Sequence, residues 1–375
     1  MHHHHDHFWW RFFPSKELTQ IYVSTAIRSF ANSLISLFIA LYLHKEIGLT
    51  LQETLYFFIF YAVIFAISTP IAAKFSARFG LKHSILLSVP FYLAFVVLLY
   101  LLPVLNTPLM VIAALWGVSL AFYWMGLHLV FHHASHKGHR GEEFGKRAGI
   151  SIFATMMGPL VGGFLIKFVG FKSVFVLASI LLFSSALFLF LSKEDYVKYQ
   201  FSLRNLLIRE HWENSIFFTS RGVWGMTSGV IWPLFIFSIL NDYLSLGIVG
   251  SLLAGVSAIF ILLVGKYSDK IGKRKIIKWI SGFESLSWFV RSAVVTTTHV
   301  FGATVFGALT HGIMESPIGA LGYDKAKDKV AEYFVSREVY ICLGRILVLI
   351  FVLMTNSLSS GLIFNGFTNL AALLF

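Results

Sequence analysis

Twelve stretches of about 20 mostly apolar residues follow one another along the chain, and they restrict its fold more than any other feature. A helix rises 1.5 Å per residue, so about 20 residues cross the roughly 30 Å hydrocarbon core of a bilayer. Only 13% of the residues are charged, against about 25% in soluble proteins. The pattern predicts an all-α membrane protein with twelve transmembrane helices. The predicted segments are 18–43, 51–73, 84–103, 107–131, 147–168, 171–192, 214–240, 246–265, 276–297, 299–323, 338–356 and 358–375.

The basic residues lie mainly on one side of these segments. Most of the 30 Lys and Arg residues fall in alternate loops, which is the positive-inside distribution of a protein with both termini in the cytoplasm. The net charge of +12 therefore needs no nucleic-acid partner. We expect an integral protein of the plasma membrane, in contact with the lipid bilayer.

A short basic turn occurs twice, once in each half of the chain. Residues 265–275 align without a gap with residues 73–83, which lie 192 positions earlier. A repeat of about half the chain length in a hydrophobic protein predicts two similar bundles. We expect pseudo-symmetric six-helix bundles at 18–192 and 214–375, a cytoplasmic N-terminal segment at 1–17 and a cytoplasmic linker at 193–213. An amphipathic helix is expected within the linker around 203–208.

The second copy of the turn resembles a motif of the major facilitator superfamily of secondary transporters, found in that family between the second and third helices. The matching residues of the second copy are Gly265, Asp269, Lys270, Gly272, Lys273 and Arg274. The first copy keeps Lys74, Arg78, Gly80 and Lys82 but has Ala73 and Ala77 where the family has glycine and aspartate. The resemblance implies alternating access, with these loops acting in gating.

A second resemblance lies in the fifth predicted helix. Gly158, Pro159, Gly162 and Gly163 match a G-P-x-x-G-G element of the superfamily's antiporters. Glycines permit close helix contact, and proline removes a backbone donor and bends the helix. We expect a kinked helix packed closely against a neighbour.

Two arginines within apolar segments point to the substrate site. Arg28 and Arg221 lie 193 residues apart, at corresponding positions of the first and seventh predicted helices. Arginine at mid-bilayer costs about 2.5–3.5 kcal/mol on insertion scales, so each needs a cavity, a partner or a route to the membrane surface. The pair resembles that of the organophosphate antiporters, where it grips phosphate. Asn32, Trp124 and Trp224 complete the expected site.

Carboxylates within the apolar segments are fewer than arginines. These segments contain two carboxylates, Glu284 and Glu315, and four arginines. The excess of positive charge favours an anionic substrate. We expect Glu315 in the tenth predicted helix to bind substrate and, with His311, to carry protons; Glu284 and Arg291 share a helix face and are interpreted as structural. The partners are a small-molecule substrate and protons or a counter-substrate, and the protein is expected to be a monomer. The competing hypothesis is a proton-driven exporter of amphipathic compounds.

Hypotheses of other classes rest on weaker features. His128, His132 and His133 resemble one histidine box of membrane di-iron oxidases, but the several boxes such enzymes need are missing, and an interfacial cluster is the simpler interpretation. A receptor or scaffold of the same fold is the remaining alternative. The single cysteine, Cys342, excludes an internal disulfide. We expect no enzymatic activity, no cofactor and no metal site.

Overall fold

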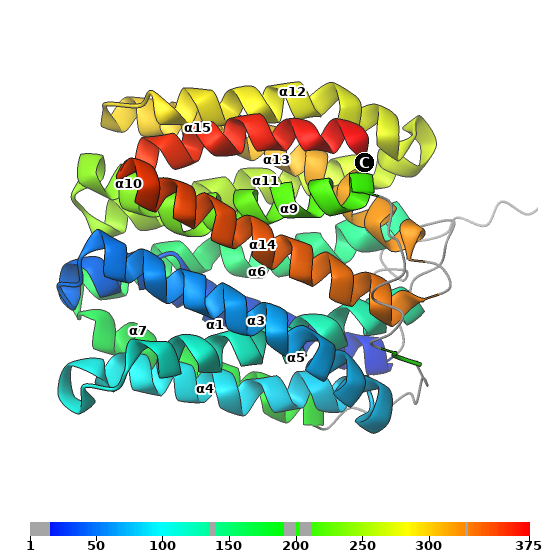
Figure 1. Ribbon diagram of the computed structural model, residues 1–375, viewed down its shortest axis with the longest axis horizontal. Helices are drawn as coiled ribbons and strands as arrows, with labels where there is room; N and C mark the ends of the chain where they lie inside the picture. Colours follow the sequence, from blue (N-terminus) through cyan, green and yellow to red (C-terminus); the bar gives the residue numbers. More distant parts are fainter. Residues whose placement is uncertain (1–15, 135–139, 191–199, 203–211, 327–328) are drawn as a thin grey trace, which may run out of the picture.

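The computed structural model describes residues 16–134, 140–190, 200–202, 212–326 and 329–375. The N-terminal histidines, the aromatic residues that follow them, His136, His139 and the predicted linker helix around 203–208 lie outside the described residues. Every regular element in the described part is helical (Figure 1). The elements of the first half are α1 Lys16–Ser36, α2 Ile39–Leu41, η1 Tyr42–Glu46, α3 Leu51–Phe79, α4 Leu81–Leu105, α5 Leu109–Ala134, α6 Arg140–Phe168 and α7 Phe171–Phe190. Those of the second half are α9 Trp212–Met226, η3 Thr227–Ile231, α10 Trp232–Leu240, α11 Tyr243–Ile271, α12 Lys273–Ser292, α13 Thr297–Lys325, α14 Val330–Thr355, α15 Leu358–Thr368 and η4 Asn369–Leu374.

Each predicted apolar segment overlaps at least one helix in the described part of the chain. Eight helical stretches among the described residues are long and apolar enough to cross a membrane, and two shorter apolar helices cover 154–168 and 358–374. Several predicted boundaries were wrong, the largest errors being at helix starts: α14 starts at Val330 rather than 338 and α6 at Arg140 rather than 147. In addition, α12 runs from Lys273 to Ser292 rather than from 276 to 297.

Capping side chains and glycines mark the ends of several of these helices. Thr50 caps α3 in a capping box with Glu53, and the Asp242 side chain accepts from the Ser245 N–H at the start of α11. Gly80 and Gly272 link α3 to α4 and α11 to α12 with φ of 100° and 98°, a conformation that favours glycine. These two glycines are 192 positions apart, the spacing of the repeated turn. The turn therefore uses a glycine at positive φ in both halves.

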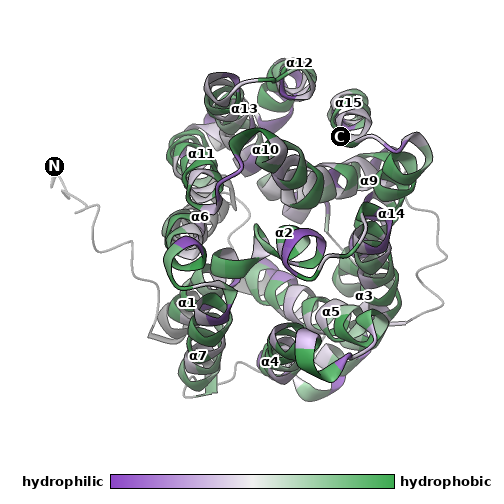
Figure 2. Cartoon of the chain, turned by 90° about the vertical axis from the view of Figure 1, so that its left-hand side faces the viewer, coloured by the Kyte–Doolittle hydropathy of each residue, from purple (hydrophilic) through white to green (hydrophobic). Residues whose placement is uncertain are grey.

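Two helix pairs join segments that are far apart in sequence. In Figures 1 and 2, α6 lies beside α11 and α14 lies beside α3. A Cβ added at Gly163 would lie 2.4 Å from the Tyr243 carbonyl oxygen, and one at Gly247 would lie 2.3 Å from that of Pro159. Only glycine permits this approach of α6 to α11. At the same end of the molecule Lys167 Nζ lies 2.9 Å from Asp242 Oδ1.

Candidate functional site

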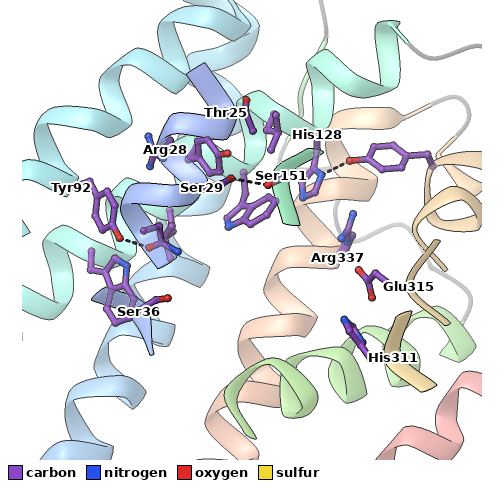
Figure 3. A pocket seen from close by; sticks show the side chains of 17 residues that line it. Thr25, Arg28, Ser29, Ser36, Tyr92, His128, Ser151, His311, Glu315 and Arg337 are labelled. Atoms are coloured by element: carbon purple, nitrogen blue, oxygen red, sulfur yellow. Dashed lines mark hydrogen bonds between the residues drawn. The ribbon is translucent and has the colours of Figure 1, made fainter. Parts of the chain in front are cut away.

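A cavity of about 520 Å³ lies between the helices of the two halves (Figure 3). Its α1 wall carries Thr25, Arg28, Ser29, Asn32 and Ser36; apart from the adjacent pair Arg28 and Ser29 they lie one helical turn apart, and so they share one helix face. This polar stripe is unusual in a membrane helix. It means that α1 turns its polar face toward the cavity and its apolar faces toward other helices and lipid.

The other walls are aromatic and charged. From α5 come Trp116, Tyr123, Trp124 and His128, again at helical spacing, and Tyr92 comes from α4. The second half contributes His311, Glu315 and Tyr323 from α13 and Arg337 from α14. In Figure 3 Glu315 lies between Arg337 and His311, across the cavity from Arg28.

Arg28 is the cation at the centre of the first-half wall. It is 4% exposed, and its Nη1 donates to Ser88 Oγ at 2.7 Å. Its guanidinium lies 3.9 Å from the centre of the Tyr123 ring and 5.4 Å from that of Tyr92. In the described part of the chain no carboxylate pairs with it. Hydroxyls and aromatic faces therefore hold a charge that they do not neutralise.

Arg221, by contrast, is paired. Its Nη2 lies 2.5 Å from Glu315 Oε2, and its guanidinium stacks 4.6 Å from the Trp224 ring centre. Its Nη1 is buried without a hydrogen-bond partner among the described residues. Arg221 and Trp224 line a smaller adjoining cavity of about 170 Å³, which shares Glu315 and Arg337 with the main one. Of the predicted substrate residues, the main cavity thus gathers Arg28, Asn32, Trp124 and Glu315, together with His311, and leaves Arg221 and Trp224 just outside.

A buried cluster that the sequence reasoning missed closes one end of the cavity. His128, 3% exposed, has its Nδ1 2.7 Å from the Tyr323 hydroxyl and its Nε2 3.1 Å from Glu338 Oε1. Its ring stacks on Phe334, with ring centres 4.9 Å apart. The interpretation of His128 as an interfacial residue was wrong, because its face of α5 points to α13 and α14. The aromatic residues one turn before it, Tyr123 and Trp124, were the available signal for that face.

The charged residues at the edge of the site have structural partners. Glu284, 1% exposed, accepts from Trp224 Nε1 at 3.1 Å, from Trp288 Nε1 at 3.2 Å and from the Thr310 hydroxyl. Arg291 lies over the Trp288 ring at 4.2 Å. Arg345 donates from Nη1 to the Tyr61 hydroxyl at 3.2 Å and so links α14 to α3. Thus Glu284 accepts a hydrogen bond from Trp224, a residue of the smaller cavity's wall, without lining either cavity itself. Arg345 links the second half of the chain to the first through Tyr61.

The two predicted motifs lie away from the cavity. Lys82 Nζ donates to the Phe190 carbonyl at 3.2 Å, and Lys273 Nζ lies 2.7 Å from Asp324 Oδ2. The side chain of Asp269 lies outside the described residues. In the fifth-helix motif, Gly158 packs against Ser33 and Gly162 against Leu34 of α1. The remaining motif residues, Lys74, Arg78, Gly265, Lys270 and Arg274, lie at the ends of α3, α11 and α12.

The family model described as Major Facilitator Superfamily matches residues 21–349. Among curated proteins, the uncharacterized protein YqgE of Bacillus subtilis (strain 168) is 25% identical over 260 residues, covering 64% of this chain and 59% of that protein. The match thus spans less than two thirds of the relative's length.

Solved structures share the fold at low identity. A human organic anion transporter superimposes with a TM-score of 0.70 at 11% identity, covering 97% of this chain and all of that one. The E. coli fucose:proton symporter gives 0.68 at 12%, covering 96% and 98%. A bacterial homologue of the iron transporter ferroportin, in an outward-facing state, gives 0.70 at 12%, covering 95% and 96%.

Proposed function

Because the chain belongs to the Major Facilitator Superfamily, whose members are membrane transporters, we propose that it moves a small organic anion across the membrane. The observation that carries the proposal is Arg28, a buried cation in the cavity wall that no carboxylate of the described residues neutralises. Leaving such a charge unpaired costs several kcal/mol. An anionic substrate offsets that cost, and a planar guanidinium can grip a carboxylate or phosphate through two hydrogen bonds.

The wider charge distribution supports the same substrate class. Four arginines line the main and the adjoining cavity, Arg28, Arg221, Arg337 and Arg345, and Glu315 is the one carboxylate among the described residues that line them. Two of the transporters with this fold are described as carrying an organic anion and fucose with a proton. At 11% and 12% identity they bear on the fold alone, so the anion proposal depends on the charges.

Proton coupling is proposed at Glu315. A proton on this carboxylate would remove the ion pair with Arg221 and free a second guanidinium beside the cavity. The anion would then find two guanidinium groups, Arg28 in one half and Arg221 in the other. Proton and anion therefore bind together, and His311 next to Glu315 is the candidate relay.

The transport cycle is proposed to be alternating access by two six-helix bundles, 18–192 and 214–375, joined by the linker 193–213. The equal length of α3 and α11, both 29 residues and 192 positions apart, supports the duplication. Rocking of one bundle against the other around a central site is the usual consequence of such a repeat. We further propose twelve membrane crossings, cytoplasmic termini, a monomer and the plasma membrane as its location.

Export of amphipathic compounds is the second candidate. Trp116, Tyr123, Trp124 and Tyr92 give the cavity large aromatic walls, which also suit a flat apolar ligand or a cation. The two candidates differ in what Arg28 does. An anion needs its charge, whereas a cationic amphipath is repelled by it.

The test is ligand binding and uptake by reconstituted protein. Thermal-shift screening should compare organic carboxylates and phosphates with cationic amphipaths, using wild type, Arg28→Lys and Arg28→Gln. The proposal expects anions to stabilise wild type, Arg28→Lys to keep part of the shift and Arg28→Gln to lose it. Ser29→Ala is the matched control, because it changes a cavity residue without changing charge. Equal anion shifts in wild type and Arg28→Gln would refute the proposal, and stabilisation by cationic amphipaths in Arg28→Gln would favour the exporter.

A further inference from the structure

A second cavity, of about 570 Å³, lies at the end of the molecule where α12 begins and α13 ends. Its walls come from the start of α9, the first turns of α12, the last residue of α13 and η4. The charged side chains in these walls are Arg274, Lys278 and Lys325 with a single carboxylate, Glu213. The side chains lining the cavity thus carry an excess of positive charge.

These cations have no carboxylate partner in the part of the chain that the structure describes. Lys325 Nζ donates to Asn214 Oδ1 at 2.7 Å and lies 3.6 Å from the centre of the Phe375 ring. By contrast Lys273, next to Arg274, pairs with Asp324 at 2.7 Å. Lys273, which does not line the cavity, is thus paired with a carboxylate, whereas the cations that line the cavity are not.

The environment of Lys325 reflects this excess. Lys325 ends α13, beyond the apolar residues 299–323. Burial, and then the charge of Arg274, lower the pKa of Lys325 to about 8, although Glu213 acts in the opposite direction. The negative charge of an anion placed in the cavity would raise the pKa of Lys325 again, because it favours the protonated amine.

The first turn of α12 adds to the positive potential. Its N-cap, Gly272, has no side chain to accept from the free N–H groups, and Lys273, Arg274 and Lys275 follow it directly. The N-terminus of a helix already carries partial positive charge, so cations are unfavourable there unless an anion is nearby.

The surroundings place this cavity at the level of lipid headgroups. Trp212 and Trp279, next in sequence to the cavity residues Glu213 and Lys278, are 61% and 74% exposed. Exposed tryptophans of membrane proteins gather at the bilayer interface. Leu373 and Leu374, which line the cavity, are 46% and 44% exposed. Exposed and half-buried cations thus line the same cavity as apolar side chains suited to contact an acyl chain.

We propose that this cavity binds the phosphate group of an anionic phospholipid, with Arg274, Lys278 and Lys325 as its ligands and Leu373 and Leu374 against the acyl chains. The same three cations would accept the phosphate of a soluble ester, so the test includes both sources. The proposal is independent of what the central cavity transports.

The experiment compares two double variants of the full chain in nanodiscs. Arg274→Gln/Lys278→Gln removes two cavity cations, and Lys270→Gln/Lys275→Gln removes two exposed cations of the same region that do not line the cavity. Binding of phosphatidylglycerol over phosphatidylcholine is measured by native mass spectrometry of retained lipid and by thermal shift. Size-exclusion profiles check folding, and Lys325→Gln serves as an independent variant.

The cavity double variant is expected to bind phosphatidylglycerol about 100-fold more weakly than wild type, since each direct hydrogen bond between a cation and the phosphate contributes roughly a factor of ten. The control double variant should bind like wild type. Equal losses in both doubles would mean non-specific attraction and overturn the proposal, as would unchanged binding in the cavity variant and in Lys325→Gln.

Two further arms complete the test. Glycerol phosphate is added without anionic lipid, in wild type, in the cavity variant and in Arg28→Gln. A shift of equal size to that of phosphatidylglycerol, lost only in the cavity variant, would assign the site to a soluble phosphate and overturn the lipid assignment. Raising the pH past about 8 removes the Lys325 proton, so lipid affinity should fall in wild type and stay level in Lys325→Gln.

Discussion

His128 Nε2 lies 3.1 Å from Glu338 Oε1, although the two residues are 210 positions apart in the chain. The contact joins α5 of the first half to α14 of the second beside the central cavity. Both side chains are nearly inaccessible, at 3% and 4% exposure. Separation of α5 from α14 must break it, so it stabilises the conformation described here relative to one opened at this end.

His128→Ala should therefore favour opening between α5 and α14. Breaking a buried pair by removing one partner costs about 3–5 kcal/mol in the conformation that contains it. Cys342, one turn after Glu338 and fully buried, is the single cysteine of the chain and reports the opening. Its rate of labelling by a membrane-permeant maleimide should rise at least tenfold.

His299→Ala is the control for this variant, because His299 is exposed at the start of α13. It should label at the wild-type rate. If His128→Ala labels as slowly as His299→Ala, the contact does not hold this end closed.

Glu315→Gln should uncouple anion binding from protons. The amide cannot pair with Arg221 as a carboxylate does, so the guanidinium is free at every pH. Anion binding should become tighter and lose its pH dependence, while wild type should bind more tightly on acidification. Equilibrium binding across a pH series measures both effects. A Glu315→Gln protein with the wild-type pH profile would exclude Glu315 as the coupling residue.

Gly247→Ala should weaken the packing of α11 on α6. The new methyl group would lie 2.3 Å from the Pro159 carbonyl oxygen, so one helix must move, at a cost of about 1–3 kcal/mol. The melting temperature in detergent should fall. Gly302→Ala is the matched control, since nothing lies within 4 Å of its added Cβ and alanine favours helix. A melting temperature for Gly247→Ala equal to that of Gly302→Ala would contradict the close approach.

Asp242 should show a small, pH-dependent contribution to stability. Burial raises the pKa of Asp242, but hydrogen bonds from Lys167 and Ser245 outweigh it and lower the pKa overall. The folded form thus favours the carboxylate, so its contribution is present above the ordinary pKa and is lost as the pH falls through the lowered value.

Two substitutions separate the roles of this aspartate. Asp242→Asn keeps a capping oxygen but loses the ion pair with Lys167, and should cost about 0.5 kcal/mol at neutral pH because the pair is partly exposed. Asp242→Ala loses the cap as well and should cost about 1 kcal/mol more. Thermal melting at neutral and acidic pH measures both. A deficit of Asp242→Asn that persists in acid would show that charge is not its cause.

The positions of the helices could be predicted from the sequence because a helix that crosses a bilayer needs a long run of apolar residues. The repeated turn was equally visible, because Gly80 and Gly272 fix its backbone locally. Arg28 could be identified as a cavity residue, since an arginine within an apolar helix has few other places to go.

The orientation of partners across helices could not be predicted. Hydropathy does not distinguish the face of α9 that pairs Arg221 with Glu315 from the faces beside it. Glu338 lay at the edge of a predicted segment, so its charge was not weighed with the buried ones. His128 was interpreted as one member of a histidine cluster, and its place in the sequence does not reveal that Tyr323 and Glu338 meet it from two other helices.

The hydrogen bond from Trp224 Nε1 to Glu284 has an evolutionary consequence. Trp224 stacks on His311, whose ring lines the main cavity, with ring centres 4.3 Å apart. Glu284 and Thr310, which accept and donate behind this stack, do not line the cavity themselves. Substitutions at Glu284 or Thr310 during evolution can therefore alter which substrate binds, although neither residue lines the cavity.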